Sequence, residues 1–518
     1  MRRRSRAPDT GSGVSERLFE QHFRVLFTTA TFAFLYLPVV LAGFFILGHR
    51  SPKWAAAWLL AASLFFYGWW MPEFTLLLLA SIGANFAVGL RIVAAGEARK
   101  EAKAWLTAGV VFNLGLLGYF KYANFFIDSL SALLGTHWRL AEVILPIGIS
   151  FYTFTQIAFL VDAWHGKVHE TRPVHYGLFV TYFPHLIAGP VLHHAQMMPQ
   201  FADRAVYRFS AVNFSAGLFI FCLGLFKKIV LADGIAPYAD AVFNPVDAGS
   251  APTMSEAWIG ALAYTLQLYF DFSGYSDMAI GLSWMFNIRL PYNFNSPYKA
   301  SSISDFWRRW HISLSTFLRD YLYVPLGGNR KGPARRYINL ALTMILGGLW
   351  HGASWSFVIW GALHGAYLMV NHAFRALAER AGLSAALDRS RLFTVFAWAI
   401  TFVATVFAWV FFRAVELDGA LRMVLAMSGL LGSQPDTALL LWNAGLQANV
   451  ALIWILGLGL IALVFTNSND IGERLRQWLG RNSAWRALLG ASALMLAALL
   501  VVINTTRDSV SAFIYFNF

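Results

Sequence analysis

Two stretches between residues 305 and 365 decide the fold: DFWRRWHISLSTFLRDYLYVPLGGNRKG (305–332) and NLALTMILGGLWHGASWSFVIWGALHG (339–365). The second is a long apolar run of the kind that spans a lipid bilayer. Arginines, aspartates and three histidines (His311, His351 and His364) stand in or beside these segments. Ionisable groups at membrane depth are costly, so their presence predicts a functional site within a membrane protein.

The composition of the whole chain agrees with this class. Of 518 residues, 58% are hydrophobic and only 13% are charged, whereas a soluble protein carries about a quarter charged residues. We therefore predict an all-α, polytopic membrane protein with about 11 transmembrane helices, each a run of about 20 apolar residues. The predicted spans are residues 25–48, 54–70, 73–90, 104–120, 143–163, 212–231, 258–285, 338–370, 393–412, 447–466 and 486–504.

Some apolar segments are too short or too interrupted to span a bilayer. Residues 123–135 are short, and residues 175–192 contain Pro184, Gly189 and Pro190. We expect re-entrant or interfacial pieces there, because irregular backbone is tolerated at membrane depth only where protein or water covers it.

The basic charge of the chain indicates contact with lipid rather than with nucleic acid. The net charge is +13, and the basic residues lie in short loops between apolar runs. In that position they orient the protein and contact membrane lipids. The single cysteine, Cys222, excludes a disulfide framework and is expected in the core. Neither an HExxH, a GxSxG nor a phosphate-cradling motif is present, so we expect no metal.

The N-terminal tail differs from the rest of the chain. Residues 1–24 are polar and hold six arginines. We expect this tail to be weakly ordered, or translation to start near Val25, ahead of one membrane domain over residues 25–518. The basic loop 91–103 predicts a cytoplasmic side for that loop, which places the tail outside.

The segment 304–323 has the apolar spacing of an amphipathic helix. Trp307, His311 and Leu314 fall on one stripe, so we expect His311 to point into the protein. It is either a hydrogen-bonded structural histidine or a wall of the reaction chamber. Asp305, Arg308 and Arg309 lie largely on other faces, where the arginines would bind lipid headgroups or, less simply, a phosphorylated cofactor.

The LGGLWHGASW segment is the strongest candidate for the reaction centre. His351 follows Trp350 and precedes a glycine, and glycines allow close backbone approach. Burial favours the neutral imidazole that a general base requires, although a lone histidine in an apolar run is often structural. On a continuous helix His364 would lie about 20 Å and roughly 140° away from His351. We therefore expect His364 to be structural or to lie on an access path, unless the helix breaks.

Two carboxylates stand in the aromatic segment YFDFSGYSDMAIGLSWMFNIRLPYNFNSPY (269–298). We expect Asp271 and Asp277 to pair with Arg308 or Arg309, most simply as structural ion pairs.

Taken together, these segments resemble the membrane-bound O-acyltransferases, specifically the bacterial branch of alginate O-acetyltransferases. The resemblance covers about residues 25–518. The matching stretches are PIGISFYTFTQIAFLVDAWHG, FPHLIAGPV, YFDFSGYSDMAIG, LPYNFNSPY, both stretches quoted first, WVFFRA (409–414) and the terminal FIYFNF.

The resemblance implies a helical domain around a funnel or tunnel in the bacterial inner membrane. It implies that His351 in the WHG motif is the essential histidine and that His311 in RRWHISLS is the second. It also implies a cytoplasmic thioester donor, acetyl-CoA in this branch, and periplasmic partner proteins for polysaccharide acetylation. No bound cofactor is expected. Supporting or substrate-path roles are expected for Trp350, Trp310, Asp305, Arg308, Arg309, Asp271, Asp277 and His364.

The function expected from this resemblance is transfer of an acetyl group to hydroxyls of an exported polysaccharide, most simply alginate. His351 would act as general base and His311 would orient the donor or assist proton movement. Four alternatives remain open: another exopolysaccharide such as cellulose, D-alanylation of teichoic acid, a lipid acceptor, and a non-catalytic acyl transporter.

Overall fold

The computed structural model describes residues 26–96, 98–431, 439–482, 484–505 and 511–514. In this part of the chain all regular secondary structure is helical, as predicted. Residues 1–25 lie outside the described part of the chain, so the expectation of a weakly ordered tail, or of a translation start near Val25, stays a prediction.

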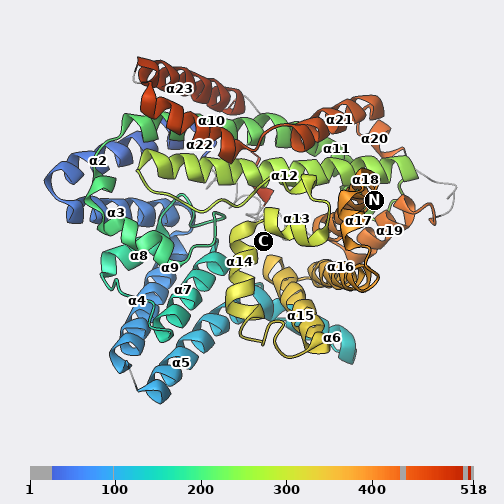
Figure 1. The fold of residues 1–518 in the computed structure, drawn as a ribbon, viewed down its shortest axis with the longest axis horizontal. Helices are drawn as coiled ribbons and strands as arrows, with labels where there is room; N and C mark the ends of the chain where they lie inside the picture. Colours follow the sequence, from blue (N-terminus) through green and yellow to red (C-terminus); the bar gives the residue numbers. More distant parts are fainter. Residues whose placement is uncertain (1–25, 97, 432–438, 483, 506–510, 515–518) are drawn as a thin grey trace, which may run out of the picture.

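Most of the N-terminal third lies on one side of the molecule, and α6 extends from it toward α15 (Figure 1). Prolines at the first positions of α2, α3, α4 and α8 start those helices, where a missing N–H is harmless. The elements are the π-helical turn η2 (Thr31–Tyr36), α2 (Leu37–Arg50), α3 (Pro52–Trp70), α4 (Pro72–Ala95), α5 (Arg99–Leu117), the π-helical turn η3 (Gly118–Tyr122), α6 (Ala123–Leu134), α7 (Ile149–Trp164), α8 (Pro173–Thr181), α9 (His194–Ala202) and the 3-10 turn η4 (Arg204–Tyr207).

The middle of the chain supplies the centre of the fold. The long helix α12 crosses the molecule between α10 and α11 on one side and α13 and α14 on the other (Figure 1). The elements are α10 (Ala211–Phe226), the π-helical turn η5 (Lys227–Ala232), α11 (Asp233–Asp247), α12 (Met254–Met285), the 3-10 turn η6 (Pro297–Lys299), α13 (Ile303–Arg309), α14 (Ile312–Leu318), the π-helical turn η7 (Arg319–Tyr323), α15 (Pro333–His351) and α16 (Trp355–Arg380).

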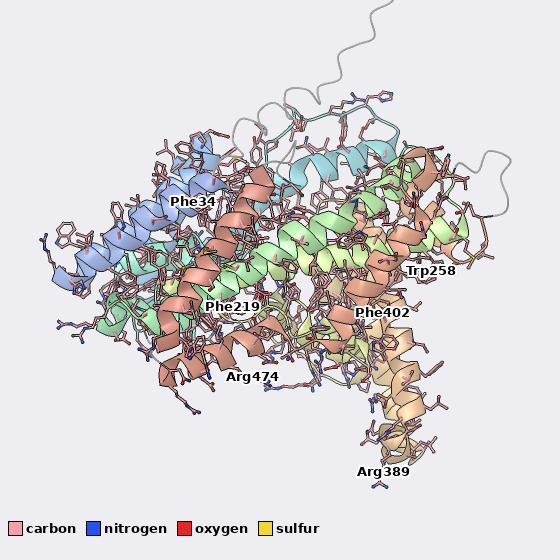
Figure 2. The ribbon with its side chains drawn as sticks, turned by 90° about the horizontal axis from the view of Figure 1, so that it is seen from above. Phe34, Phe219, Trp258, Arg389, Phe402 and Arg474 are labelled. Atoms are coloured by element: carbon pink, nitrogen blue, oxygen red, sulfur yellow. The ribbon has the colours of Figure 1, made fainter. Side chains whose placement is uncertain are left out.

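The C-terminal part packs against that centre. Helices α16, α17 and α18 form a projection from the body, with Arg389 at its tip, and Arg474 lies at the edge of the body (Figure 2). The elements are α17 (Ser384–Arg389), α18 (Arg391–Arg413), α19 (Leu417–Met427), α20 (Leu440–Asn443), α21 (Ala448–Val464), α22 (Ser468–Arg481) and α23 (Ala484–Thr505).

Fewer helices qualify as membrane spans than the sequence predicted. By length and composition, six of the described helices can cross a membrane, or seven if the pair α21 and α22, bent by 54°, is one span. The expected spans 54–70, 143–163, 258–285 and 338–370 do not qualify. Helix α7 has only 16 residues, whereas α12 has 32 residues but is not apolar enough. Residues 338–370 are divided between α15 and α16.

The two short apolar segments differ from each other. Residues 123–135 were expected to be interfacial or re-entrant. In the structure α6 continues α5 through η3, so that Arg99–Leu134 forms one 36-residue helical segment. Residues 182–192 form an irregular elbow in which every residue is buried. Protein therefore covers this backbone, as irregular structure at membrane depth requires.

Candidate active site

The candidate active site is a pair of buried histidines, one at the end of a helix and one in the break between two others. His351 is the last residue of α15 and His311 directly precedes α14. Their ring centroids are 6.3 Å apart, and their exposed fractions are 2% and 0%. Two segments that are 40 positions apart in the sequence thus place their imidazoles beside each other.

A break in the chain at His311, rather than a helical stripe, points this side chain inward. The expectation of one helix over 304–323 was wrong, because α13 ends at Arg309 and α14 begins at Ile312. His311 has φ +43° and ψ +55°, a left-handed conformation that is strained for any residue with a Cβ. The backbone N–H of Leu314 donates to His311 Nδ1 at 3.3 Å, so the imidazole caps α14.

Two upstream loops hold this break in place, one 20 and the other 122 positions before Ser313. The carbonyl of Asn293 accepts from the N–H of Ile312 at 3.0 Å. The Oδ1 of Asn293 accepts from Ser313 Oγ at 2.6 Å. Ser313 Oγ in turn accepts from the N–H of Val191 at 2.9 Å, which attaches the buried elbow. The LPYNFNSPY and FPHLIAGPV segments therefore support the conformation of His311.

A second break fixes His351. Helix α15 ends at His351 and the chain is extended at Gly352, with φ −166° and ψ 149°. A Cβ on Gly352 would overlap Cε2 of Phe357, so only glycine fits against that ring. Upstream, a Cβ on Gly348 would overlap the carbonyl oxygen of Phe357. The glycines therefore allow α16 to fold back closely on α15.

This break brings His364 close to the pair. The expectation that a continuous helix separates His364 from His351 was wrong. Trp360 contacts both rings, with centroid distances of 5.1 Å to His351 and 4.8 Å to His364. The indole N–H of Trp307 donates to His364 Nδ1 at 3.3 Å. His364 therefore belongs to the wall behind His351.

Aromatic side chains enclose the pair. The ring centroid of His351 lies 4.9 Å from that of Trp350 and 5.1 Å from that of Phe412 in the WVFFRA segment. Phe272 contacts His311 at 4.8 Å. Trp310, which is fully buried, packs on Trp409 at 4.8 Å and belongs to the aromatic layer around the pair. This enclosure keeps bulk water away from both imidazoles.

The carboxylates of α12 pair with lysines, not with the expected arginines. Lys227 Nζ lies 2.7 Å from Asp277 Oδ2. Lys228 Nζ lies 2.8 Å from Asp271 Oδ1 and 2.9 Å from Asp233 Oδ1. The two lysines escaped the sequence analysis, although adjacent lysines inside the apolar run 212–231 were the available signal. Burial makes such charges costly unless they are paired, and here they are.

The charged residues of α13 lie closer to the surface. Arg309 Nε pairs with Asp305 Oδ2 at 2.9 Å, one helical turn away. Arg308 is exposed. These positions leave Arg308 available to headgroups.

Metal-binding geometry does not occur in the described ranges, where no group of three histidine, cysteine, aspartate or glutamate side chains is placed to hold an ion. Cys222 is buried, and its thiol donates to the carbonyl of Ala493 at 2.9 Å. It lies on α10, away from the residues that enclose the histidines.

The comparison with known proteins identifies the class. The family model of the membrane-bound O-acyltransferases (MBOAT) matches residues 153–412, which include both histidines. A probable alginate O-acetylase AlgI of Pseudomonas putida is 41% identical over 505 residues, covering 95% of this chain and 100% of that protein. A peptidoglycan O-acetyltransferase of Helicobacter pylori is 44% identical, covering 79% of this chain and 81% of that protein.

A more distant relative is named for a different activity. A teichoic acid D-alanyltransferase of Bacillus subtilis is 27% identical over 51% of this chain. The chain belongs to the membrane-bound O-acyltransferase family and is a multi-pass membrane O-acyltransferase. Within the family it is similar to the alginate O-acetylases, at 41–47% identity over most of the chain.

Proposed function

We propose that this protein transfers an acetyl group from a cytoplasmic thioester donor, acetyl-CoA, toward hydroxyl groups of an exported polysaccharide. The observation that carries the proposal is the buried, aromatic-lined pair of His311 and His351. The names of the relatives support an acetyl group and a polysaccharide acceptor, with alginate and peptidoglycan named for different relatives. Alginate is the acceptor we propose, because several similar relatives carry that name.

In the proposed mechanism His351 is the general base. Its neutral imidazole takes the proton from an acceptor hydroxyl as the oxygen attacks the thioester carbonyl. The new C–O bond replaces the C–S bond, and the proton passes from His351 to the departing thiolate. His311 orients the donor from the opposite side of the pair. The aromatic enclosure excludes water, which limits hydrolysis of the thioester.

The setting of this reaction follows from the same proposal. The protein would lie in the bacterial inner membrane with loop 91–103 in the cytoplasm, as its basic residues favour. Periplasmic partner proteins would complete the transfer to the polymer. Membrane lipids would contact the exposed basic residues, among them Arg308, without taking part in the chemistry.

The experiment is a transfer assay with the full-length protein. Membranes that contain wild-type protein or His351→Ala are incubated with acetyl-CoA labelled in the acetyl group, and label in alkali-labile ester is measured. General base catalysis contributes about 10²–10⁴-fold in rate, so we expect a loss of that size. His165→Ala, at an exposed histidine, is the matched control.

Three outcomes would overturn the proposal. Ester formation by a well-inserted His351→Ala protein at the wild-type rate would remove the base from the mechanism. Movement of label across the membrane without ester formation would instead favour an acyl transporter. Transfer of D-alanine in place of acetyl would move the protein to the teichoic acid branch of the family.

A further inference from the structure

The C-terminal end of α15, which carries His351, has no continuing helix to satisfy its backbone. The last four carbonyls of any α-helix lack partners within the helix. In α15 these belong to residues 348–351, and the chain turns away in an extended conformation at Gly352. Unpartnered carbonyls in a buried site are costly, so something outside the helix has to bind them.

Two adjacent side chains from the N-terminal third of the protein bind these carbonyls. The hydroxyl of Tyr122 donates to the carbonyl of Leu349 at 2.9 Å. The ammonium of Lys121 donates to the carbonyl of Trp350 and, at 3.4 Å, to that of His351. Three of these four carbonyls of α15 are thus bound from a position about 230 residues earlier in the chain.

The geometry of Lys121 marks it as a support rather than a reactant. Its exposed fraction is 9%. Its third hydrogen bond goes to Ser150 Oγ at 3.1 Å, so the three N–H donors of the ammonium group are all used. Within the described part of the chain Lys121 forms no ion pair with a carboxylate. The negative end of the α15 dipole is therefore the counter-charge that remains beside it.

The local structure of the support also indicates a functional constraint. Lys121 and Tyr122 lie in the π-helical turn η3, between α5 and α6. Single π-helical turns are uncommon and often occur at functional sites, because the extra residue changes which side chains face a given direction. Here the turn aims two consecutive polar side chains at α15.

We propose that Lys121 and Tyr122 form a clasp on the end of α15 that positions His351 against His311 during acyl transfer. The proposal rests on the function proposed above and adds two positioning residues to it. A displacement of about 1 Å in a catalytic group can cost about 10²-fold in rate. Without the clasp, the last turn of α15 would fray and His351 would leave its place in the pair.

The first test distinguishes loss of the position of His351 from loss of the overall fold. In Lys121→Met the side chain keeps its length but loses all three hydrogen bonds. We expect kcat for acetyl transfer from acetyl-CoA to fall about 10–100-fold, with KM for acetyl-CoA nearly unchanged. Lys121→Arg keeps a cation and should recover most of the rate, which a purely space-filling role would not require. Lys103→Met, at an exposed lysine of α5, is the matched control.

The second test does not depend on the reaction. Diethyl pyrocarbonate modifies accessible histidines, and mass spectrometry reports the modification rate at each one. We expect His351 to react several-fold faster in Lys121→Met than in wild type, while exposed His165 reacts equally in both. If the wild-type protein transfers no acetyl group, the proposed function is contradicted. The modification rate of His351 would still show whether Lys121 holds the end of α15 in place.

Tyr122→Phe keeps the proposal testable if Lys121→Met does not accumulate. It removes one hydrogen bond, worth about 1 kcal/mol or about fivefold in rate. Tyr119→Phe on the same turn, at an exposed tyrosine, is its control. The proposed clasp is contradicted if well-folded Lys121→Met retains both the wild-type kcat and the wild-type modification rate of His351. If Lys121→Met does not accumulate, the same result for Tyr122→Phe contradicts it. It is also wrong if Lys121→Arg restores stability without restoring kcat.

Discussion

Two buried polar regions of this protein keep ionisable groups away from water in opposite ways. On one side of α12, Lys228 is held between Asp271 and Asp233, with N–O distances of 2.8 and 2.9 Å. On the other side His311 and His351 stand among aromatic rings. The first region balances charge with charge. The second surrounds two buried imidazoles, which are titratable groups, with aromatic side chains.

The difference shows how to distinguish buried ionisable residues that stabilise a membrane protein from those that take part in its reaction. A buried pair of opposite charges is stable only while both partners remain. It therefore suits a joint between helices better than a group that must gain and lose a proton. An imidazole can remain neutral when buried and still accept a proton during a reaction. We therefore expect changes in the lysine cluster to affect stability, and changes in the histidine pair to affect rate.

The largest effect is expected at the charged cluster. Lys228→Met leaves Asp271 and Asp233 buried without their cation, and breaking such a pair costs about 3–5 kcal/mol. Thermal unfolding of the detergent-solubilised protein should show a large loss of stability. Replacing both carboxylates as well, with Asp271→Asn and Asp233→Asn, should restore much of it. A single variant as stable as wild type would contradict the structural role of the cluster.

The next effect concerns the break after His351. Gly352→Ala places a Cβ against the ring of Phe357 where there is no room for it, so the ring or the backbone has to shift, at a cost of about 1–3 kcal/mol. Both unfolding temperature and acetyl-transfer rate should fall. Ala353→Gly, at the following residue, is the control that adds backbone flexibility without the clash. A Gly352→Ala protein with unchanged rate would show that the site tolerates the shift.

A clean separation of rate from stability is expected at His311. Asparagine also adopts positive φ and can cap a helix, so His311→Asn should preserve the break while removing the imidazole. We expect acetyl transfer to fall about tenfold or more, because the donor loses the group that orients it and a displacement of about 1 Å can cost about 10²-fold in rate. The unfolding temperature should change little. If His311→Asn lowers stability but not the transfer rate, His311 has a structural role like that of the lysine cluster.

The smallest effect is expected at the outer pair of α13. Asp305→Asn removes the partner of Arg309, but both side chains are about a third exposed, and such pairs contribute about 0–1 kcal/mol. Neither stability nor transfer rate should change beyond that range. A loss of transfer greater than tenfold would place Asp305 in the reaction path and not at the surface.

Several features could be predicted from residues alone. Apolar runs and low charge indicated an all-helical membrane protein, and the WHG and RRWHISLS segments contained the two histidines that meet in the structure. Periodicity failed at His311, because it assumes that a helix continues. A left-handed residue and the hydrogen bonds that Asn293 accepts interrupt it instead. The same assumption placed His364 too far from His351.

The partners of buried charged side chains could not be predicted from the sequence, for a physical reason. Asp271 and Asp277 required cations, and arginine was the obvious choice nearby in sequence. Their actual partners, Lys228 and Lys227, lie on a different helix, and only helix packing determines which charges meet. Lys121 provided no signal at all, since a lysine near the end of an apolar segment normally reaches toward the membrane surface.

The sequence by itself determined that this protein lies in a membrane, and which chemical groups it can use. Hydrophobicity and residue type determine both, and they are local properties. Tertiary structure decided which of those groups meet. It broke two helices at Trp310–His311 and Gly352–Ser354, brought the imidazoles to 6.3 Å and placed Lys121 on the end of α15. Such contacts depend on the packing of segments distant in sequence, where the cost of an unpaired buried group selects its partner.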